Sequence, residues 1–254
     1  MKVNPSFKKV SISACWVAGD IIRKNFGKKI GIKEKRDLTL VTETDLEADR
    51  IIATIIKRNF PDHNIVSEES GGKMATKGYN WVIDPLDGTT NYISDFPFFS
   101  VSMALLEGMV PILGVVFNPI NKDLYCAQRG EGAYLNGKRI RVNRVENLRK
   151  VNLGFSKGKD LAGGIKTLAK LIPFIRTFRY LGSDNLAICQ LAAGRIDGFM
   201  VRRSAYYDVA AGVLIAQEAG AIATDFNNKQ YKYGSLNLVV GNKKIHSKLL
   251  KLIR

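Results

Sequence analysis

The sequence predicts a mixed fold of the α+β or α/β class, in which helices pack against two β-sheets. Three observations support it: apolar residues at helical spacing near both ends of the chain, consecutive strand-like segments in the middle, and alternating strands and helices after about residue 150. The chain has 254 residues, 46% of them hydrophobic, and no internal repeat or Gly/Ser/Pro-rich linker. We therefore expect one compact unit over residues 1–254, with an N-terminal lobe of about 1–145 and a C-terminal lobe of about 146–254.

The N-terminal part begins with two expected helices. Residues 6–26 carry apolar groups at helical spacing, and residues 45–59 place four isoleucines on one face. The second helix starts beside a capping-box pattern at residues 44–47, Thr-Asp-Leu-Glu. Short strand-like runs follow at 64–67 and 81–84.

The middle of the chain predicts a largely antiparallel sheet. Residues 98–106, 111–117 and 124–127 are typical strands, and Asn136-Gly137 indicates a tight hairpin. The C-terminal part predicts a second, smaller mixed sheet with strands at 151–155, 197–201, 221–224 and 236–240. Helices are expected at 160–171, 183–193 and 208–219, with a last helix at 244–253.

The charge balance is unusual. The formal net charge is +16, Lys and Arg are dense over residues 138–179, and no acidic residue follows Asp225. Such a surface can attract nucleic acid, an anionic membrane or anionic metabolites. The lack of an arginine-rich block or nucleic-acid motif favours instead a solvated basic surface with no dedicated partner.

The remaining bulk features predict an ordinary cytoplasmic protein. No signal peptide or run of eighteen apolar residues is present, so membrane insertion is not expected. The three cysteines are far apart and predict buried free thiols. The two histidines, His63 and His246, lie in no motif and are expected at the surface.

Acidic residues gather at the ends of predicted elements. The richest segment ends the strand at 81–84, where Asp84 and Asp87 flank Pro85. Proline fixes one backbone angle and Gly88 permits a turn, so the two carboxylates can converge on one point. Like charges so close raise each other's pKa unless a cation lies between them, and carboxylates without His or Cys favour magnesium. The alternative is a simple turn, since Asp-Pro and Asp-Gly are common turn formers.

With its neighbouring segments, this stretch resembles the inositol monophosphatase family of lithium-sensitive, magnesium-dependent phosphatases. The family hallmark D-P-[IL]-D-G-T-x-N is matched at every position of residues 84–91. The second signature, W-D-x-A-A-G, corresponds to residues 207–212 with Tyr in place of Trp. The G-E-E segment corresponds to 67–69 and V-T-x-x-D to 41–45. These matches follow one another in the family order over about residues 41–220.

The resemblance implies a layered α-β-α-β-α sandwich of the sugar-phosphatase type, usually dimeric. It implies two or three Mg²⁺ ions per active site, held by Glu68, Asp84, Asp87, Asp208 and the Leu86 carbonyl. A water molecule activated by metal would attack the phosphate monoester, with Asp45, Thr89 and Glu68 as catalytic residues. Phosphate and substrate would contact Asp87, Gly88, Thr89, Gly182 and Ser183.

Substrate choice stays open between inositol 1-phosphate and fructose 1,6-bisphosphate, on which archaeal-type relatives with both activities act. Inositol-selective relatives carry a glutamate seven residues before the second-signature aspartate, where this chain has Val201. Arg202 and Arg203 follow and could bind a second phosphate, or could be solvated charges at a strand end. Asp184 could replace the missing hydroxyl contact. An upstream lysine often approaches this site in the family, and either Lys33 or Lys35 could fill that place.

Two alternatives come from other functional classes. A nucleotide 3′-phosphatase acting on 3′-phosphoadenosine 5′-phosphate shares the metal core, but needs a basic and aromatic adenine pocket that the sequence does not reveal. A basic nucleic-acid-binding protein on the same scaffold would suit the charge of +16. The complete set of acidic residues argues against that second alternative, because a retired enzyme has no reason to keep them.

Overall fold

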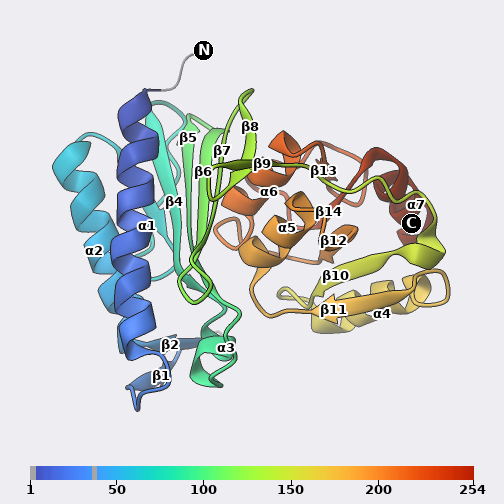
Figure 1. The fold of residues 1–254 in the computed structure, drawn as a ribbon, viewed down its shortest axis with the longest axis horizontal. Coiled ribbons are helices and arrows are strands. Elements are labelled where there is room, and N and C mark those ends of the chain that lie inside the picture. The colour runs from blue at the N-terminus through green and yellow to red at the C-terminus, as the bar shows by residue number, and fades with distance from the viewer. Residues whose placement is uncertain (1–3, 36–38) are drawn as a thin grey trace.

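The computed structural model describes residues 4–35 and 39–254, which form five layers (Figure 1). Helices α1 (Pro5–Asn25) and α2 (Glu43–Asn59) cover the outer face of a seven-stranded sheet. Helices α5 (Asp184–Ala192) and α6 (Ala210–Glu218) lie between the two sheets. Helices α4 (Leu161–Leu171) and α7 (Lys243–Ile253) cover the outer face of the five-stranded sheet. The expected α-β-α-β-α sandwich is confirmed.

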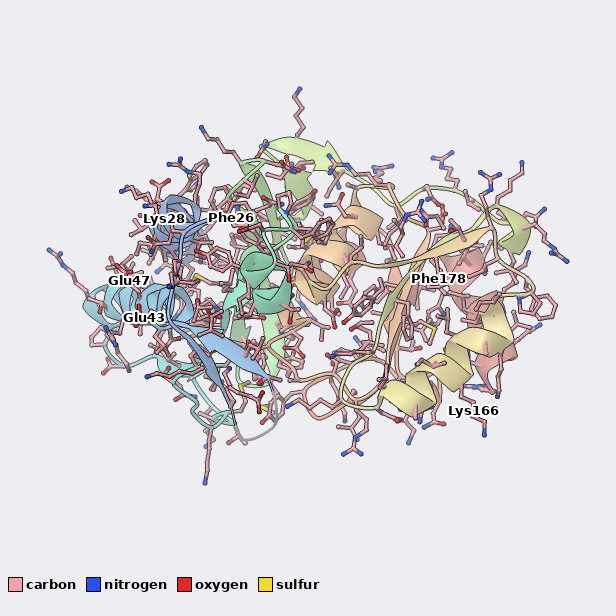
Figure 2. The ribbon with its side chains drawn as sticks, turned by 90° about the horizontal axis from the view of Figure 1, so that it is seen from below. Phe26, Lys28, Glu43, Glu47, Lys166 and Phe178 are labelled. Atoms are coloured by element: carbon pink, nitrogen blue, oxygen red, sulfur yellow. The ribbon has the colours of Figure 1, made fainter. Side chains whose placement is uncertain are left out.

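The outer helical layers lie at opposite ends of the molecule. Figure 2 shows Glu43 and Glu47 on the side of α2, and Lys166 on α4 at the far end. None of the helices built from the described residues has the length and apolar character needed to cross a bilayer.

The larger sheet is antiparallel except at one edge, where β3 runs parallel to β4. Its hairpin at Asn136-Gly137 is as expected, with φ of 49° and 77° at the two turn residues. The strands, in spatial order, are β3 (Asn64–Ser67), β4 (Tyr79–Asp87), β5 (Ser100–Glu107), β6 (Val110–Asn118), β7 (Asp123–Gln128), β8 (Gly132–Leu135) and β9 (Lys138–Ile140).

The smaller sheet is mixed, as expected, with β11 and β12 parallel to β10 and two antiparallel pairs beyond. In spatial order its strands are β11 (Thr177–Tyr180), β10 (Asn152–Ser156), β12 (Gly198–Val201), β14 (Leu238–Gly241) and β13 (Ile222–Thr224). Three short strands were not anticipated: β11, and the pair β1 (Ile32–Glu34) and β2 (Leu40–Thr42). β1 and β11 are mostly exposed, so they lack the alternation that marks a half-buried strand.

The expected capping box at residues 44–47 was wrong. The cap is Thr42: its hydroxyl accepts a hydrogen bond from the amide of Asp45 (3.3 Å), and the Asp45 carboxylate accepts one from the amide of Thr42 (2.9 Å). Two overlapping Thr-x-x-acid patterns compete here, and the earlier one wins because β2 ends at Thr42. The helix expected from residue 208 likewise begins later, at Ala210.

The expected surface position of the histidines was also wrong. His246 is 3% exposed, with its Nε2 2.9 Å from the Thr224 hydroxyl. His63 is half-buried and accepts a hydrogen bond from Trp81 Nε1 (3.0 Å). Burial lowers the pKa of both rings. A single histidine carries no periodicity signal, so sequence could not reveal these contacts. The three cysteines are buried and free, as expected.

The contact between α6 and β6 depends on Gly114. A β-carbon at this position would lie 2.8 Å from the backbone oxygen of Ala211. Gly114→Ala should therefore lower the free energy of unfolding by about 1–3 kcal/mol, because the helix must move off the sheet. Urea unfolding followed by circular dichroism measures this change.

A matched control is Gly164→Ala in α4, where the nearest atom to the new β-carbon is 3.3 Å away. We expect it to lower stability less than Gly114→Ala does, because the nearest atom belongs to the Phe155 ring, which can shift slightly, and alanine favours a helix over glycine by about 1 kcal/mol. Equal stability of the two variants would contradict the importance of the close approach at Gly114.

Two small helices complete the chain: α3 (Thr89–Ile93), which follows β4 directly, and the 3₁₀ turn η1 (Leu148–Lys150) between β9 and β10.

Candidate active site

A β-bulge at the end of β4 brings two aspartates to one face of the larger sheet. Asp84 pairs with Ser102 and Asp87 with Ser100, so three residues along β4 oppose two along β5. In a regular strand, residues three apart point to opposite faces. The extra residue restores the alternation, and both carboxylates face the layer of α5 and α6.

The parallel pairing of β3 with β4 places Glu68 beside Asp84. Ser67 is in register with Ile83, and the amide of Glu68 donates to the carbonyl of Ile83 (3.1 Å). Lys35 follows β1 directly. Its Nζ lies 3.1 Å from Glu68 Oε1 and 2.6 Å from Glu69 Oε1. The choice left open between two lysines is thereby settled in favour of Lys35, since β1, which contains the other lysine, is exposed.

Asp208 comes from the turn before α6 and is held there by a residue that sequence reasoning missed. The Asn185 amide on α5 donates to Ser102 Oγ (2.9 Å) and to the carbonyl of Tyr207 (2.8 Å). Its oxygen accepts from the amide of Gly212 (2.9 Å). Asn185 therefore ties the sheet to both sides of Asp208. What distinguishes Asn185 is its complete burial at the start of a helix, and burial cannot be read from a single sequence.

Asp87 is fixed by the amino end of α5. Its Oδ1 accepts from the amide of Asp184 (2.9 Å), and its Oδ2 accepts from the hydroxyls of Ser183 (2.7 Å) and Ser100 (3.1 Å) and the amide of Leu186 (3.3 Å). These hydrogen bonds join the strand of the first motif to a segment nearly one hundred residues later in the chain.

The turn between β4 and α3 requires a glycine. Gly88 has φ of 103°, and a β-carbon there would lie 3.1 Å from the carbonyl oxygen of Gly182. The Asn91 amide spans the same gap, donating to the carbonyls of Phe98 (2.6 Å) and Leu181 (2.7 Å). The predicted residues Gly88, Gly182 and Ser183 are thus brought together.

Glu68, Asp84 and Asp208 form an acidic cluster, with one oxygen from each lying within 4.8 Å of the others. Burial raises the pKa of Asp84, and the charges of Glu68, Asp87 and Asp208 raise it further. Burial raises the pKa of Asp208 too, followed by the charges of Asp184 and Glu68. Such a concentration of buried carboxylates is costly unless a cation neutralises it. Oxygen-only donors fit a hard divalent cation.

Asp87 lies next to this cluster but outside the set of mutually close oxygens, since its two oxygens accept the hydrogen bonds of α5. Burial raises its pKa to about 6, although those hydrogen bonds oppose the shift. The predicted carbonyl ligand, Leu86, lies between the two aspartates and accepts from the Thr89 hydroxyl at 3.1 Å.

Thr89 and Asp45 form the expected pair. The Thr89 hydroxyl lies 2.9 Å from Asp45 Oδ1, while Asp45 Oδ2 accepts from the hydroxyl and amide of Thr42. Burial raises the pKa of Asp45, and the hydrogen bonds from Thr42 and Thr89 oppose this. A threonine oxygen close to the acidic cluster and tied to a buried carboxylate can orient a water molecule and pass on its proton.

The residues expected on the substrate side separate into two groups. Asp184 is close to the cluster: its charge raises the pKa of Asp208, and its own pKa is raised to about 7 by burial and by Asp87. Arg202 is elsewhere, because its Nε donates to Asp160 (2.9 Å) and its side chain packs over the ring of Phe226. Asp160 caps α4, on the face of the smaller sheet opposite to α5 and α6.

Arg203 is exposed and has φ of 52°, and no contact joins its side chain to the acidic cluster among the described residues. Val201 is fully buried in the core between the sheets. Strand alternation explains why Val201 is buried between the sheets while Arg202 is not. Val201 is the last residue of β12 and Arg202 follows it, so their side chains point to opposite faces of the smaller sheet.

Comparisons with known proteins agree with this geometry. The model of the inositol monophosphatase family matches residues 4–254. A fructose-1,6-bisphosphatase/inositol-1-monophosphatase of Aquifex aeolicus is 34% identical, covering 98% of this chain and 95% of that protein. The Nus factor SuhB of Vibrio cholerae is 38% identical, covering 96% and 94%. The solved structure of an IMPase from Thermotoga maritima superposes with a TM-score of 0.91 at 33% identity, covering 98% and 96%. The chain belongs to the inositol monophosphatase family.

Proposed function

We propose that this protein hydrolyses a phosphate monoester of a small polyol or sugar, with Mg²⁺ as the cofactor. The observation that carries the proposal is the acidic cluster of Glu68, Asp84 and Asp208 next to the Thr89–Asp45 pair. Carboxylates alone cannot attract an anionic phosphate, so the cluster is suited to phosphate chemistry only when cations are bound.

Each residue has a role in this proposal. Glu68, Asp84, Asp87, Asp208 and the Leu86 carbonyl would hold two or three Mg²⁺ ions, which would supply Lewis acidity and lower the pKa of bound water. Thr89 and Asp45 orient the attacking water and take up its proton. The backbone amides of Gly88 and Thr89 donate to the phosphate oxygens. Water adds to phosphorus and the ester P–O bond breaks. The leaving oxygen takes a proton from a solvent water molecule, and the alcohol and inorganic phosphate leave.

The contacts of Arg202 favour a monophosphate substrate such as inositol 1-phosphate over a bisphosphate. A second phosphate needs a cation near the substrate, and Arg202 is paired with Asp160 on the other face of the smaller sheet. We assign the substrate's hydroxyls to Asp184, which lies beside Asp87 and close to Asp208, because a carboxylate accepts hydrogen bonds from hydroxyls but repels a phosphate. Fructose 1,6-bisphosphate is the competing candidate, because the relative from Aquifex aeolicus is named a fructose-1,6-bisphosphatase/inositol-1-monophosphatase.

The test is phosphate release from inositol 1-phosphate, fructose 1,6-bisphosphate and 3′-phosphoadenosine 5′-phosphate, with Mg²⁺ and then with EDTA. We expect inositol 1-phosphate to have the highest kcat/KM and EDTA to stop all three reactions. Turnover that continues undiminished in EDTA would falsify the metal mechanism. A highest kcat/KM for 3′-phosphoadenosine 5′-phosphate would favour the nucleotide 3′-phosphatase instead.

Asp184→Ala should change selectivity. We expect the ratio of kcat/KM for fructose 1,6-bisphosphate over inositol 1-phosphate to rise by about tenfold, equivalent to about 1.4 kcal/mol. The variant loses repulsion of the second phosphate and also loses an acceptor for substrate hydroxyls. Asp20→Ala, which removes an exposed carboxylate of α1, should leave the ratio unchanged. An unchanged ratio in Asp184→Ala would show that this carboxylate does not face the substrate.

We also propose that the protein acts as a homodimer in which residues 1–145 and 146–254 of each chain work as one unit. Exposed apolar side chains on α4 and β11, such as Ile165 and Phe178, support self-association.

A further inference from the structure

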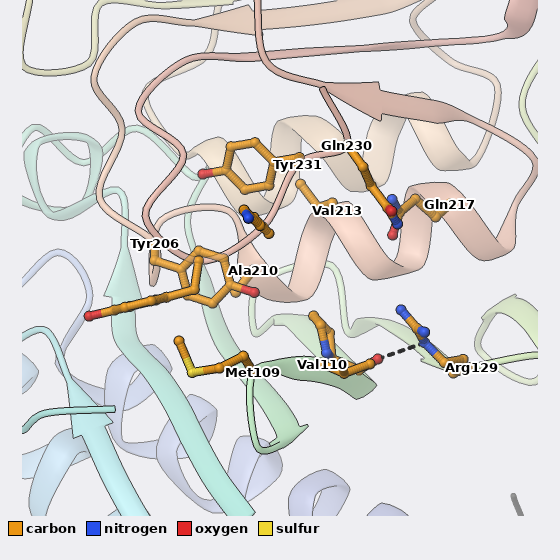
Figure 3. A pocket seen from close by; sticks show the side chains of 12 residues that line it. Met109, Val110, Arg129, Tyr206, Ala210, Val213, Gln217, Gln230 and Tyr231 are labelled. Atoms are coloured by element: carbon orange, nitrogen blue, oxygen red, sulfur yellow. Dashed lines mark hydrogen bonds between the residues drawn. The ribbon is translucent and has the colours of Figure 1, made fainter. Parts of the chain in front are cut away.

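A cavity of about 440 Å³ lies beside α6, and two of its lining residues, Tyr206 and Ala210, flank Asp208 in the chain (Figure 3). We call it the tyrosine pocket. Its volume falls within the roughly 300–1,000 Å³ of small-molecule sites. It is lined by the start of β6, by one face of α6, by the segment after β13 and by Arg129. Its lining contains no member of the acidic cluster, and β6 begins at the end of the larger sheet opposite to Asp84.

Three tyrosines give the pocket an aromatic wall. The rings of Tyr206 and Tyr231 are nearly parallel, with centroids 6.2 Å apart. The ring of Tyr233 meets Tyr206 edge-on at 5.2 Å and is 40% exposed, so it forms the rim. Together with the apolar side chains of Val110 and Val213, these rings suit a flat aromatic ligand.

The polar groups of the pocket point to an anion. Among its twelve lining residues two are cationic, Arg129 and Lys232, two are glutamines, and none is acidic. A hydrogen bond from Arg129 Nε to the carbonyl of Pro111 (3.0 Å) orients the guanidinium. The described residues supply no acceptor for its two terminal nitrogens. Figure 3 shows Arg129 across the pocket from the tyrosine rings.

The cation of Lys232 is likewise presented by the backbone. The amide of Lys232 donates to Ser235 Oγ (3.2 Å), and the carbonyl of Lys232 accepts from the amide of Ser235 (2.9 Å). These bonds close a turn over residues 232–235, which begins directly after Tyr231 and contains Tyr233. The aromatic rim and the cation therefore belong to one ordered turn.

We propose that the tyrosine pocket binds a nucleoside monophosphate, with the base against the tyrosine rings and the phosphate beside Arg129 and Lys232. The ligand needs both parts, because the aromatic wall provides stacking and the cations provide charge pairing. Since the pocket contains no carboxylate, it binds the anion without metal. This separates it from the acidic cluster, which repels phosphate until cations are present.

The experiment is calorimetric titration of the whole protein with adenosine 5′-monophosphate in EDTA. EDTA prevents metal-dependent binding at the acidic cluster. We expect saturable binding of one nucleotide per chain. Adenosine and ribose 5-phosphate, which each lack one part of the ligand, should bind at least about tenfold more weakly. Absence of binding in EDTA, or binding of ribose 5-phosphate as tight as that of the nucleotide, overturns the proposal.

Variants place the binding in the tyrosine pocket. Lys232→Gln and Tyr233→Ala alter exposed side chains, so the fold is retained, and each should raise Kd at least about tenfold. Lys229→Gln removes a nearby exposed cation that does not line the pocket and should leave Kd unchanged. Equal Kd in all three variants assigns the nucleotide to another surface and overturns the proposal.

Discussion

Asp84→Asn is expected to abolish phosphate release while stabilising the metal-free protein. Asp84 is 2% exposed and lies among the charges of Glu68, Asp87 and Asp208, so it is central to any cation site. Loss of a group that merely supports a metal ligand costs about 10–100-fold, so loss of Asp84 should lower kcat by more than about a hundredfold. Phosphate release from inositol 1-phosphate measures this.

The same substitution removes a buried carboxylate that has no cation when metal is absent. We expect the free energy of unfolding in EDTA to rise by about 1–3 kcal/mol. Burial and neighbouring charges raise the pKa of Asp84 above its ordinary value of 3.8. The folded state therefore keeps a proton that the unfolded chain releases, and stability in EDTA falls as pH rises above that value.

Urea unfolding at pH 5 and pH 8 in EDTA tests the sign. The wild type should lose more stability between these two pH values than Asp84→Asn does, since the variant cannot contribute that proton. The control is Asp20→Asn, which neutralises an exposed carboxylate paired with Arg23. This variant should behave as the wild type in both activity and stability. If Asp84→Asn is inactive but less stable than the wild type in EDTA, Asp84 is a structural residue rather than part of a charged cation site.

Magnesium is expected to stabilise the protein strongly. A ligand at one hundred times its Kd contributes about 2.7 kcal/mol to the folded state. For a chain of this size each kcal/mol corresponds to about 2–4 °C in Tm, so saturating Mg²⁺ should raise Tm by roughly 5–10 °C over EDTA. The physical reason is that the cation removes the repulsion within the acidic cluster.

Differential scanning calorimetry with Mg²⁺, Na⁺ at matched ionic strength, and EDTA measures this shift. Na⁺ controls for simple screening, which acts on all surface charges alike. The shift should be nearly absent in Asp84→Asn and Asp208→Asn. A full shift in both variants would mean that Mg²⁺ binds elsewhere on the protein.

Much of the fold could be predicted from sequence because its main elements have local signals. The long helices α1 and α2 carry apolar residues at helical spacing, and the strands β4 to β7 are short, mostly apolar runs. The short strands β1 and β11 are exposed and were missed. The cap of α2 was misplaced by two residues because two capping patterns overlap, and only the end of β2 selects Thr42.

The acidic residues of the cluster could also be predicted, because each lies in a short motif with its own local geometry. Asn185 and the orientation of Arg202 could not. Asn185 acts through Ser102 and Gly212, and Arg202 through Asp160, all far away in the chain. When two contacting residues are far apart in the chain, their contact depends on how the layers pack. The residues next to each of them in the sequence do not reveal that packing.

By itself, the sequence determined the chemical type of this protein: a set of carboxylates and a threonine in four ordered motifs, at the ends of recognisable strands and helices. Only the tertiary structure decided that Lys35 rather than Lys33 meets Glu68, that Arg202 turns away from the cluster, and that three tyrosines enclose a separate pocket. Motif chemistry depends on neighbours along the chain, whereas these contacts arise when two sheets and three helical layers pack together.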